Sequence, residues 1–165
     1  MTQRHMKNLQ TLEKTIGINF KNKALLQNAF IHRSYLNENK NLRLHSNEKL
    51  EFLGDSVLSL VTSVYLYKIY PLFHEGDYTE IKSSIVRTES LAEAARNLKL
   101  GDYLYLSKGE EINDGRKNKN ILADCFEALI AVIFLDQGFR KADSFVTKYL
   151  FKDRLDHLID EKLYL

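Results

Sequence analysis

The chain has 165 residues, of which 44% are apolar and 28% are charged, which is enough for one hydrophobic core and short for two. These fractions, with 11% aromatic residues, exclude a disordered, collagen-like or low-complexity chain. The single cysteine, Cys125, excludes an internal disulfide framework and a multi-cysteine zinc site. No apolar run approaches the roughly 18 residues of a membrane span, so we expect one cytoplasmic domain with no membrane attachment.

The net charge of +2 is unevenly distributed along the chain. Residues 1–50 carry nine Lys and Arg against three Asp and Glu, residues 51–115 carry six against eleven, and residues 116–165 carry nine against eight. A basic half beside an acidic centre can indicate anion binding around a metal-holding group of carboxylates, although charge blocks are more often solvated faces. The charge pattern alone leaves both interpretations open.

Most of the chain has the 3.6-residue apolar period of helices, and one proline and seven glycines give it few breakers. Residues 21–32 are predicted to form an amphipathic helix, and a polar loop at 36–46 follows. The next helix is predicted to begin at Ser46 or Asn47 and to end near Tyr70, before the only proline. This helix is so apolar that we expect it to be the central, buried helix, with the other helices of an all-α fold packed around it.

The second half of the chain is also predicted to be helical. A capping box of Asp77 and Glu80 is expected to open one helix, and Thr88 to cap another. Residues 101–120 break the period with three glycines and a polar run, so they are predicted to be a long surface loop. The remaining helices are predicted over residues 121–136, with Gly138 as the stop signal, and over residues 139–158.

Three acidic residues share one face of the apolar helix. Glu48, Glu51 and Asp55 have i, i+3 and i+7 spacing, which places their side chains in one stripe. Like charges at such spacing cost a helix a few tenths of a kcal/mol, and carboxylates on a mostly buried helix cost several more unless a positive group neutralises them. A bound cation is one way to neutralise this stripe.

A second acidic pair, Asp124 and Glu127, lies at i, i+3 spacing inside the apolar run at 121–136. Hard divalent cations such as Mg²⁺ take oxygen ligands and keep water for substrate phosphates. A single pair of this kind is more often a solvated face. Two pairs, each embedded in apolar sequence, favour a metal site more strongly. Spacing alone does not decide between a metal site and a solvated face.

The segment NEKLEFLGDSVLSLV at residues 47–61 resembles, almost letter for letter, the signature of the ribonuclease III family of double-stranded-RNA endonucleases. The segments ALLQNAFIHRSY at 24–35, EGDYTEIKSSIVRTESLAEAAR at 75–96 and ILADCFEALIAVIFLDQGF at 121–139 follow the family pattern in the same order. The resemblance covers roughly residues 10–155. It implies the all-α ribonuclease III endonuclease fold, assembled as a homodimer.

The resemblance also implies which residues carry the chemistry. The family's catalytic, metal-binding carboxylates fall on Glu51, Asp55, Asp124 and Glu127, the four residues that the two acidic pairs on buried helices contain. The implied cofactor is Mg²⁺, with Mn²⁺ as a possible substitute, and no small-molecule cofactor is expected. Cys125, between two of these residues in an apolar helix, is expected to be a small buried thiol and not a nucleophile.

The resemblance implies supporting roles for further residues. Glu48 and Glu75 match other acidic positions of the family and are implied to support the site or contact RNA. Phe52 matches an aromatic residue that inserts into the partner subunit at the dimer interface, although a core phenylalanine would look the same in the sequence. Six basic side chains could meet RNA phosphates, although each taken singly is more commonly only solvated: Arg33, Lys82, Arg87, Arg116, Lys117 and Lys119.

The implied function is Mg²⁺-dependent endonucleolytic cleavage of double-stranded RNA, including ribosomal RNA precursors, to products with 5′-phosphates and short 3′ overhangs. The alternative is a non-catalytic double-stranded-RNA-binding or dimerisation module on the same fold, and the intact carboxylate set argues against it. Typical bacterial members continue into a separate double-stranded-RNA-binding domain, whereas this sequence stops at Leu165. Residues 1–165 are then either a catalytic domain taken from a longer enzyme or a member that naturally lacks the second domain, and we expect the former because the signature resembles that of the full-length enzymes.

Overall fold

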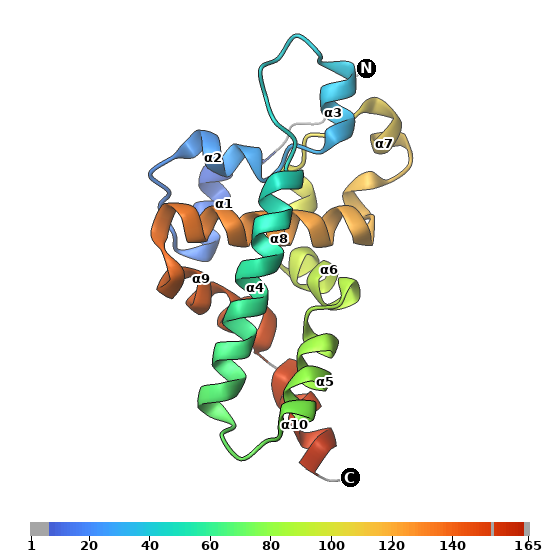
Figure 1. The fold of residues 1–165 in the computed structure, drawn as a ribbon. Helices are drawn as coiled ribbons and strands as arrows, with labels where there is room; N and C mark the ends of the chain where they lie inside the picture. The colour runs from blue at the N-terminus through green and yellow to red at the C-terminus, as the bar shows by residue number, and fades with distance from the viewer. Residues whose placement is uncertain (1–6, 153, 164–165) are drawn as a thin grey trace.

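A computed structural model describes residues 7–152 and 154–163, and every regular element in those ranges is helical, as the sequence predicts (Figure 1). The bounds of the elements are α1 Leu9–Ile16, α2 Lys23–Asn28, α3 Arg33–Glu38, α4 Glu48–Ile69, α5 Glu75–Ile85, α6 Thr88–Asn97, η1 Leu100–Tyr103, α7 Lys108–Ile112, η2 Gly115–Lys117, α8 Lys119–Gln137, α9 Phe139–Val146, η3 Thr147–Phe151 and α10 Arg154–Leu163.

The centre of the fold is α8, which α4 crosses (Figure 1). Twelve of the 19 residues of α8 are buried, and α4, α6 and α9 pack against it. A central apolar helix is therefore confirmed, but the expectation that it would be the helix at 47–70 was wrong. Only seven of the 22 residues of α4 are buried, because one face carries the exposed side chains of Phe52, Leu60 and Tyr67.

By length and composition alone, α4 could also cross a membrane, which the sequence-based expectation did not foresee. It has 22 residues and a mean hydropathy of 1.2 over its most apolar 18-residue window. One such helix is weak grounds for a membrane protein, because the core helices of other proteins have the same length and hydropathy. The extensive contact between α4 and α8 explains the apolar composition of α4.

The predicted helix at 21–32 is shorter than expected, because α2 ends at Asn28 and a turn follows at residues 29–30. Phe30 and His32 pair with one residue of a distant segment. The backbone N–H of Tyr105 donates to the carbonyl of Phe30 at 2.8 Å, and the N–H of His32 donates to the carbonyl of Tyr105 at 3.1 Å. This pairing gives the backbone groups long-range partners outside the helix, and local periodicity does not reveal it.

Residues 101–120 are not a simple surface loop, because η1, α7 and η2 lie within them. The side chain of Arg116 holds this segment together and is only 10% exposed. Its Nη1 donates to the carbonyls of Gly101 at 2.8 Å and Leu104 at 2.7 Å, and its Nε donates to Glu111 at 3.0 Å. Because these bonds occupy the guanidinium, Arg116 acts as a structural residue and not as the RNA contact considered for it.

The helix ends differ in part from their predicted signals. The N-cap of α5 is His74, three residues before the predicted N-cap Asp77, and the carboxylate of Asp77 accepts a bond of 2.9 Å from the backbone N–H of His74. Thr88 is the first residue of α6 and Arg87 is its N-cap. Gly138 ends α8 as predicted, with a φ of 91° that a side chain would disfavour.

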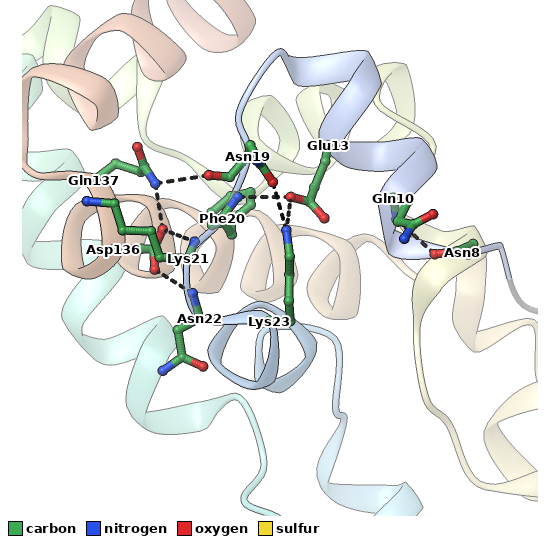
Figure 2. A network of polar contacts seen from close by, with 10 residues as sticks. All are labelled: Asn8, Gln10, Glu13, Asn19, Phe20, Lys21, Asn22, Lys23, Asp136 and Gln137. Atoms are coloured by element: carbon green, nitrogen blue, oxygen red, sulfur yellow. Dashed lines mark hydrogen bonds and ion pairs between the residues drawn. The ribbon is translucent and has the colours of Figure 1, made fainter.

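A network of hydrogen bonds and ion pairs connects the C-terminal end of α8 to the N-terminal segment (Figure 2). The carboxylate of Asp136 accepts two hydrogen bonds of 2.9 Å from the backbone N–H groups of residues 21–22. Glu13, which is 9% exposed, accepts a bond from the N–H of Phe20 at 2.9 Å and pairs with Lys23 at 2.6 Å. These bonds hold α1 and α2 against the far end of the central helix.

Candidate metal centre

The helices α4 and α8 touch backbone to backbone at Gly54. A Cβ atom at Gly54 would lie 1.8 Å from the carbonyl oxygen of Glu127 and 2.6 Å from its carbonyl carbon. No side chain fits at this point, so glycine is what allows the helices to approach so closely. Glu51 and Asp55 flank Gly54 on α4, and the close approach therefore brings their part of the helix beside Glu127 on α8.

Three of the four predicted ligands form one cluster. Glu51, Asp124 and Glu127 each offer a carboxylate oxygen, and these atoms lie within 4.8 Å of one another. Glu127 is buried, Glu51 is half-buried and Asp124 is exposed, so the cluster runs from the helix crossing to the surface. Asp55 lies outside this group of atoms, but its charge acts directly on Glu127. The structure therefore brings three of the four predicted ligands together, and the charge of the fourth, Asp55, raises the pKa of Glu127.

The carboxylates of the cluster repel one another in a partly dry environment. Burial, followed by the charge of Asp55, raises the pKa of Glu127 to about 9. Burial, followed by the charge of Asp124, raises the pKa of Glu51. Burial also raises the pKa of Asp124, and the nearby Arg33 partly opposes this rise. The mutual repulsion of these carboxylates is the condition that a bound cation relieves.

The donor set fits a hard divalent cation. Its members are all carboxylates, and Mg²⁺ and Mn²⁺ prefer oxygen ligands. Within the described residues, the cluster of Glu51, Asp124 and Glu127 is the one group of three or more potential ligands that lie this close together. Cys125 is fully buried, and burial raises the pKa of its thiol far above the usual range, so it is neither ligand nor nucleophile.

The raised pKa of Glu127 makes the stability of the metal-free protein depend on pH. Folding favours the neutral carboxyl group, so this stabilisation is complete below about pH 4.5 and is lost as pH rises toward 9. We expect the free energy of unfolding in EDTA to fall by about 2–4 kcal/mol over this range. Urea denaturation at several pH values measures this fall, and Glu127→Gln should remove most of it. Equal pH slopes for both proteins would contradict the assignment.

The structure places the two other predicted acidic residues at opposite ends of α4. Glu48, in the first turn, accepts a bond of 3.1 Å from Ser46 Oγ, and its charge raises the pKa values of Glu51 and Asp124. Glu75 lies at the start of α5, beyond the C-terminus of α4 (Figure 1). With a rise of 1.5 Å per residue, that terminus is about 27 Å along the helix axis from Glu51. Within one chain, Glu48 therefore lies near the cluster, and Glu75 lies far from it.

Phe52 points away from the core and is 77% exposed. The interpretation of Phe52 as a core side chain is therefore wrong. Exposed apolar groups at Leu60 and Tyr67 continue the same face of α4. A large apolar side chain with this exposure, followed by further apolar groups, is typical of a protein interface.

Sequence reasoning missed what Asn47 does. It occupies the N-cap position of α4, as predicted, but its buried side chain does not cap the helix. The side chain Nδ2 donates to the carbonyl of Ala29 at 2.9 Å, and its backbone N–H donates to the carbonyl of Ile31 at 2.8 Å. These bonds fix the first turn of α4, which carries Glu48 and Glu51. The only signal in the sequence was an asparagine immediately before the acidic stripe.

The fold and the cluster together define an all-α domain with a carboxylate centre suited to a divalent cation, built where two core helices cross. Comparison with known proteins identifies the group to which this domain belongs. The family model described as Ribonuclease-III-like matches residues 22–154. The chain therefore belongs to the ribonuclease-III-like family.

Individual relatives agree with this assignment. The chain is 44% identical over 153 residues to Ribonuclease 3 of Chloroflexus aurantiacus, which covers 92% of this chain and 62% of that protein. It is 44% identical over 158 residues to Ribonuclease 3 of Clostridium perfringens, which covers 96% of this chain and 65% of that protein. The chain thus spans less than two thirds of the length of these relatives.

A solved structure matches nearly end to end. The nuclease domain of ribonuclease III from Campylobacter jejuni, in a structure described as showing flexibility in the region involved in dimer formation, has a TM-score of 0.81. The sequences are 36% identical, and the match covers 88% of this chain and 98% of the Campylobacter jejuni domain. The all-α nuclease-domain fold implied by the resemblance is confirmed.

Proposed function

We propose that this chain is an endonuclease domain that cleaves double-stranded RNA with the help of Mg²⁺. The observation that carries the proposal is the carboxylate cluster, in which Glu51, Asp124 and Glu127 converge and Asp55 adds a fourth charge. Such a cluster is costly without a cation and is typical of phosphodiester hydrolysis. Membership of the ribonuclease-III-like family supports RNA as the substrate.

The four candidate carboxylates share one task in the proposed mechanism. Glu51, Asp55, Asp124 and Glu127 would hold Mg²⁺, or Mn²⁺ in its place. When bound, the cation supplies positive charge that activates water and stabilises the leaving oxygen of the RNA. The crossing of α4 and α8 fixes the carboxylates before the substrate arrives. Glu127, with its raised pKa, must release a proton before it can bind the cation.

The duplex is proposed to be recognised by its shape. A-form RNA exposes phosphates and 2′-hydroxyls while its deep groove hides the base edges. Burial raises the pKa of Asp124, and the positive charge of Arg33 partly opposes this rise. We therefore place Arg33 at the rim of the carboxylate cluster, where it would face an RNA phosphate. The products would carry 5′-phosphates and short 3′ overhangs, and ribosomal RNA precursors are among the proposed substrates.

A second copy of the chain is the proposed protein partner. Phe52, exposed on α4, would insert into the partner subunit, and the homodimer would place one carboxylate cluster against each strand of the duplex. Burial of Phe52, Leu60 and Tyr67 would remove three exposed apolar side chains of α4 from water. This arrangement accounts for the apolar groups that α4 does not use against α8.

Cleavage of a long, end-labelled RNA duplex at low salt tests the function. We expect cleavage in Mg²⁺ or Mn²⁺, none in EDTA, and little cleavage of a single-stranded RNA of the same composition. Low salt is required because phosphate contacts dominate the affinity of such a domain. If the protein binds the duplex but cuts nothing in either cation, the non-catalytic RNA-binding module on the same fold replaces the enzyme.

A further inference from the structure

A second polar site lies apart from the carboxylate cluster. A cavity of about 750 Å³ opens where the end of α5 and the start of α6 meet η3 and α10, at the C-terminal end of the fold (Figure 1). None of the four candidate metal ligands lines it. Its volume is within the range of ligand-binding cavities, about 300–1,000 Å³.

The wall of this cavity is strongly basic. Arg87, Lys148, Lys152 and Arg154 line it, and His157 adds a fifth basic group. For Arg87, Lys148 and Lys152, no carboxylate of the described residues lies within 4.0 Å. Four permanent positive charges around one hollow are unusual in a chain whose net charge is only +2. Such a concentration attracts anions.

The acidic groups of the wall do not cancel this charge. Glu93 pairs with Arg154 at 3.3 Å, and Glu161 pairs with the imidazole of His157 at 3.3 Å. Both carboxylates are largely exposed, so solvent screens these pairs. Arg87, Lys148 and Lys152, which make no such pair among the described residues, form the positive face of the cavity.

Arg154 shows that part of this face is held in place. Its side chain is 18% exposed, and its Nη1 donates to the carbonyls of Tyr149 at 3.4 Å and Leu150 at 3.1 Å. Its Nε is buried and has no hydrogen-bond partner among the residues that the structure describes. An unpaired buried donor is costly, and a ligand or a water molecule commonly satisfies it. The guanidinium is therefore positioned by the fold while its bonding capacity is incompletely used.

The chemistry of the wall identifies the class of ligand. Arginine and lysine side chains are the usual partners of phosphate groups, and the hydroxyls of Ser84 and Ser90 add hydrogen-bonding groups. An inorganic anion would leave most of 750 Å³ empty, whereas a nucleotide would fill much more of it. We propose that this cavity binds the phosphate group of a nucleotide, either free or as part of an RNA strand.

The position of the cavity connects it to the metal centre. Arg87, on its wall, immediately precedes α6, and Glu89 in the first turn of α6 pairs with Lys119 at 3.5 Å. Lys119 begins α8 and lies five residues before Asp124, about 7.5 Å along the helix axis. An RNA strand that leaves the cluster along this end of α8 would pass toward the cavity. The RNA source rests on the proposed function, and the free-nucleotide source does not.

Binding measurements with a double variant test the proposal. The probes are uridine monophosphate and a short RNA duplex, both in EDTA so that no cleavage occurs. We expect Lys148→Ala/Lys152→Ala to weaken the binding of at least one probe by about tenfold or more, because two exposed cations facing the phosphate are lost. The control is Lys14→Ala/Lys141→Ala, which removes the same charge from exposed sites on α1 and α9 and should change binding by less than about threefold.

The outcomes separate the two sources. Loss of mononucleotide affinity identifies a nucleotide site, and loss of duplex affinity alone identifies a backbone contact of RNA. Amide chemical shifts give an independent readout, since titrated uridine monophosphate or duplex should perturb residues 84–97 and 148–158. Unchanged affinities for both probes and unperturbed amides in these ranges would overturn the proposal. Glu127→Gln should retain this binding, so a failure of the proposed cleavage activity is distinguishable from a failure of this site.

Discussion

Glu127→Gln is expected to lower the rate of duplex cleavage about a thousandfold while leaving duplex affinity within about threefold. Glutamine has the size of glutamate but no charge, and its amide group is a poor substitute for a carboxylate ligand. Glu127 is the most buried member of the cluster and lies at the crossing of α4 and α8, so solvent cannot take its place. Single-turnover cleavage in Mg²⁺ and filter binding in EDTA measure the two quantities.

The matched control is Asp160→Asn, which removes one exposed carboxylate from α10, away from the cluster. It should cleave at the wild-type rate. A variant at Glu127 that retains cleavage but loses RNA binding would assign Glu127 to substrate contact and remove it from the metal centre. In the absence of metal and above pH 7, Glu127→Gln should be more stable than wild type, because the buried carboxyl group with a pKa of about 9 is gone.

Helical spacing, which is a local property, singled out the carboxylates as candidates, and the family resemblance was needed to propose them as metal ligands. Glu51 with Asp55, and Asp124 with Glu127, each occupy one helix face, and acidic side chains within apolar runs stand out against their neighbours. What brings the two helices together could not be predicted in this way. The contact of Gly54 with the backbone of Glu127 joins residues 73 positions apart, and the glycine looks like any other within its own helix.

The errors in the predicted fold have a common physical cause. Apolar composition alone made α4 look like the centre, although α4 exposes Phe52 and the more deeply buried helix is α8. The segment 101–120 has no helical period, yet the side chain of Arg116 and the backbone of Tyr105 order it. The contacts that decide these features, between helices or between Arg116 and backbone carbonyls 12 to 15 residues before it, are not encoded in the apolar period of a helix.

Gly54→Ala is expected to destabilise the protein by about 3–5 kcal/mol and to weaken Mn²⁺ binding by about tenfold or more. In an isolated helix alanine is more favourable than glycine by about 1 kcal/mol, so helix propensity opposes this result. The steric effect should dominate, because the added Cβ would lie 1.8 Å from a backbone carbonyl oxygen, which cannot rotate away as a side chain can. The helices must separate, and Glu51 then moves away from Glu127.

Gly76→Ala is the matched control for this prediction. Gly76 lies inside α5, and a Cβ there would meet nothing within 4 Å, so alanine should leave stability unchanged or raise it by up to about 1 kcal/mol. Urea denaturation in EDTA and calorimetric titration with Mn²⁺ measure stability and metal binding separately. If Gly54→Ala matched Gly76→Ala in both, the close crossing of α4 and α8 would not be what assembles the carboxylates. If stability fell while Mn²⁺ affinity held, the crossing would support the fold and the ligands would find their positions without it.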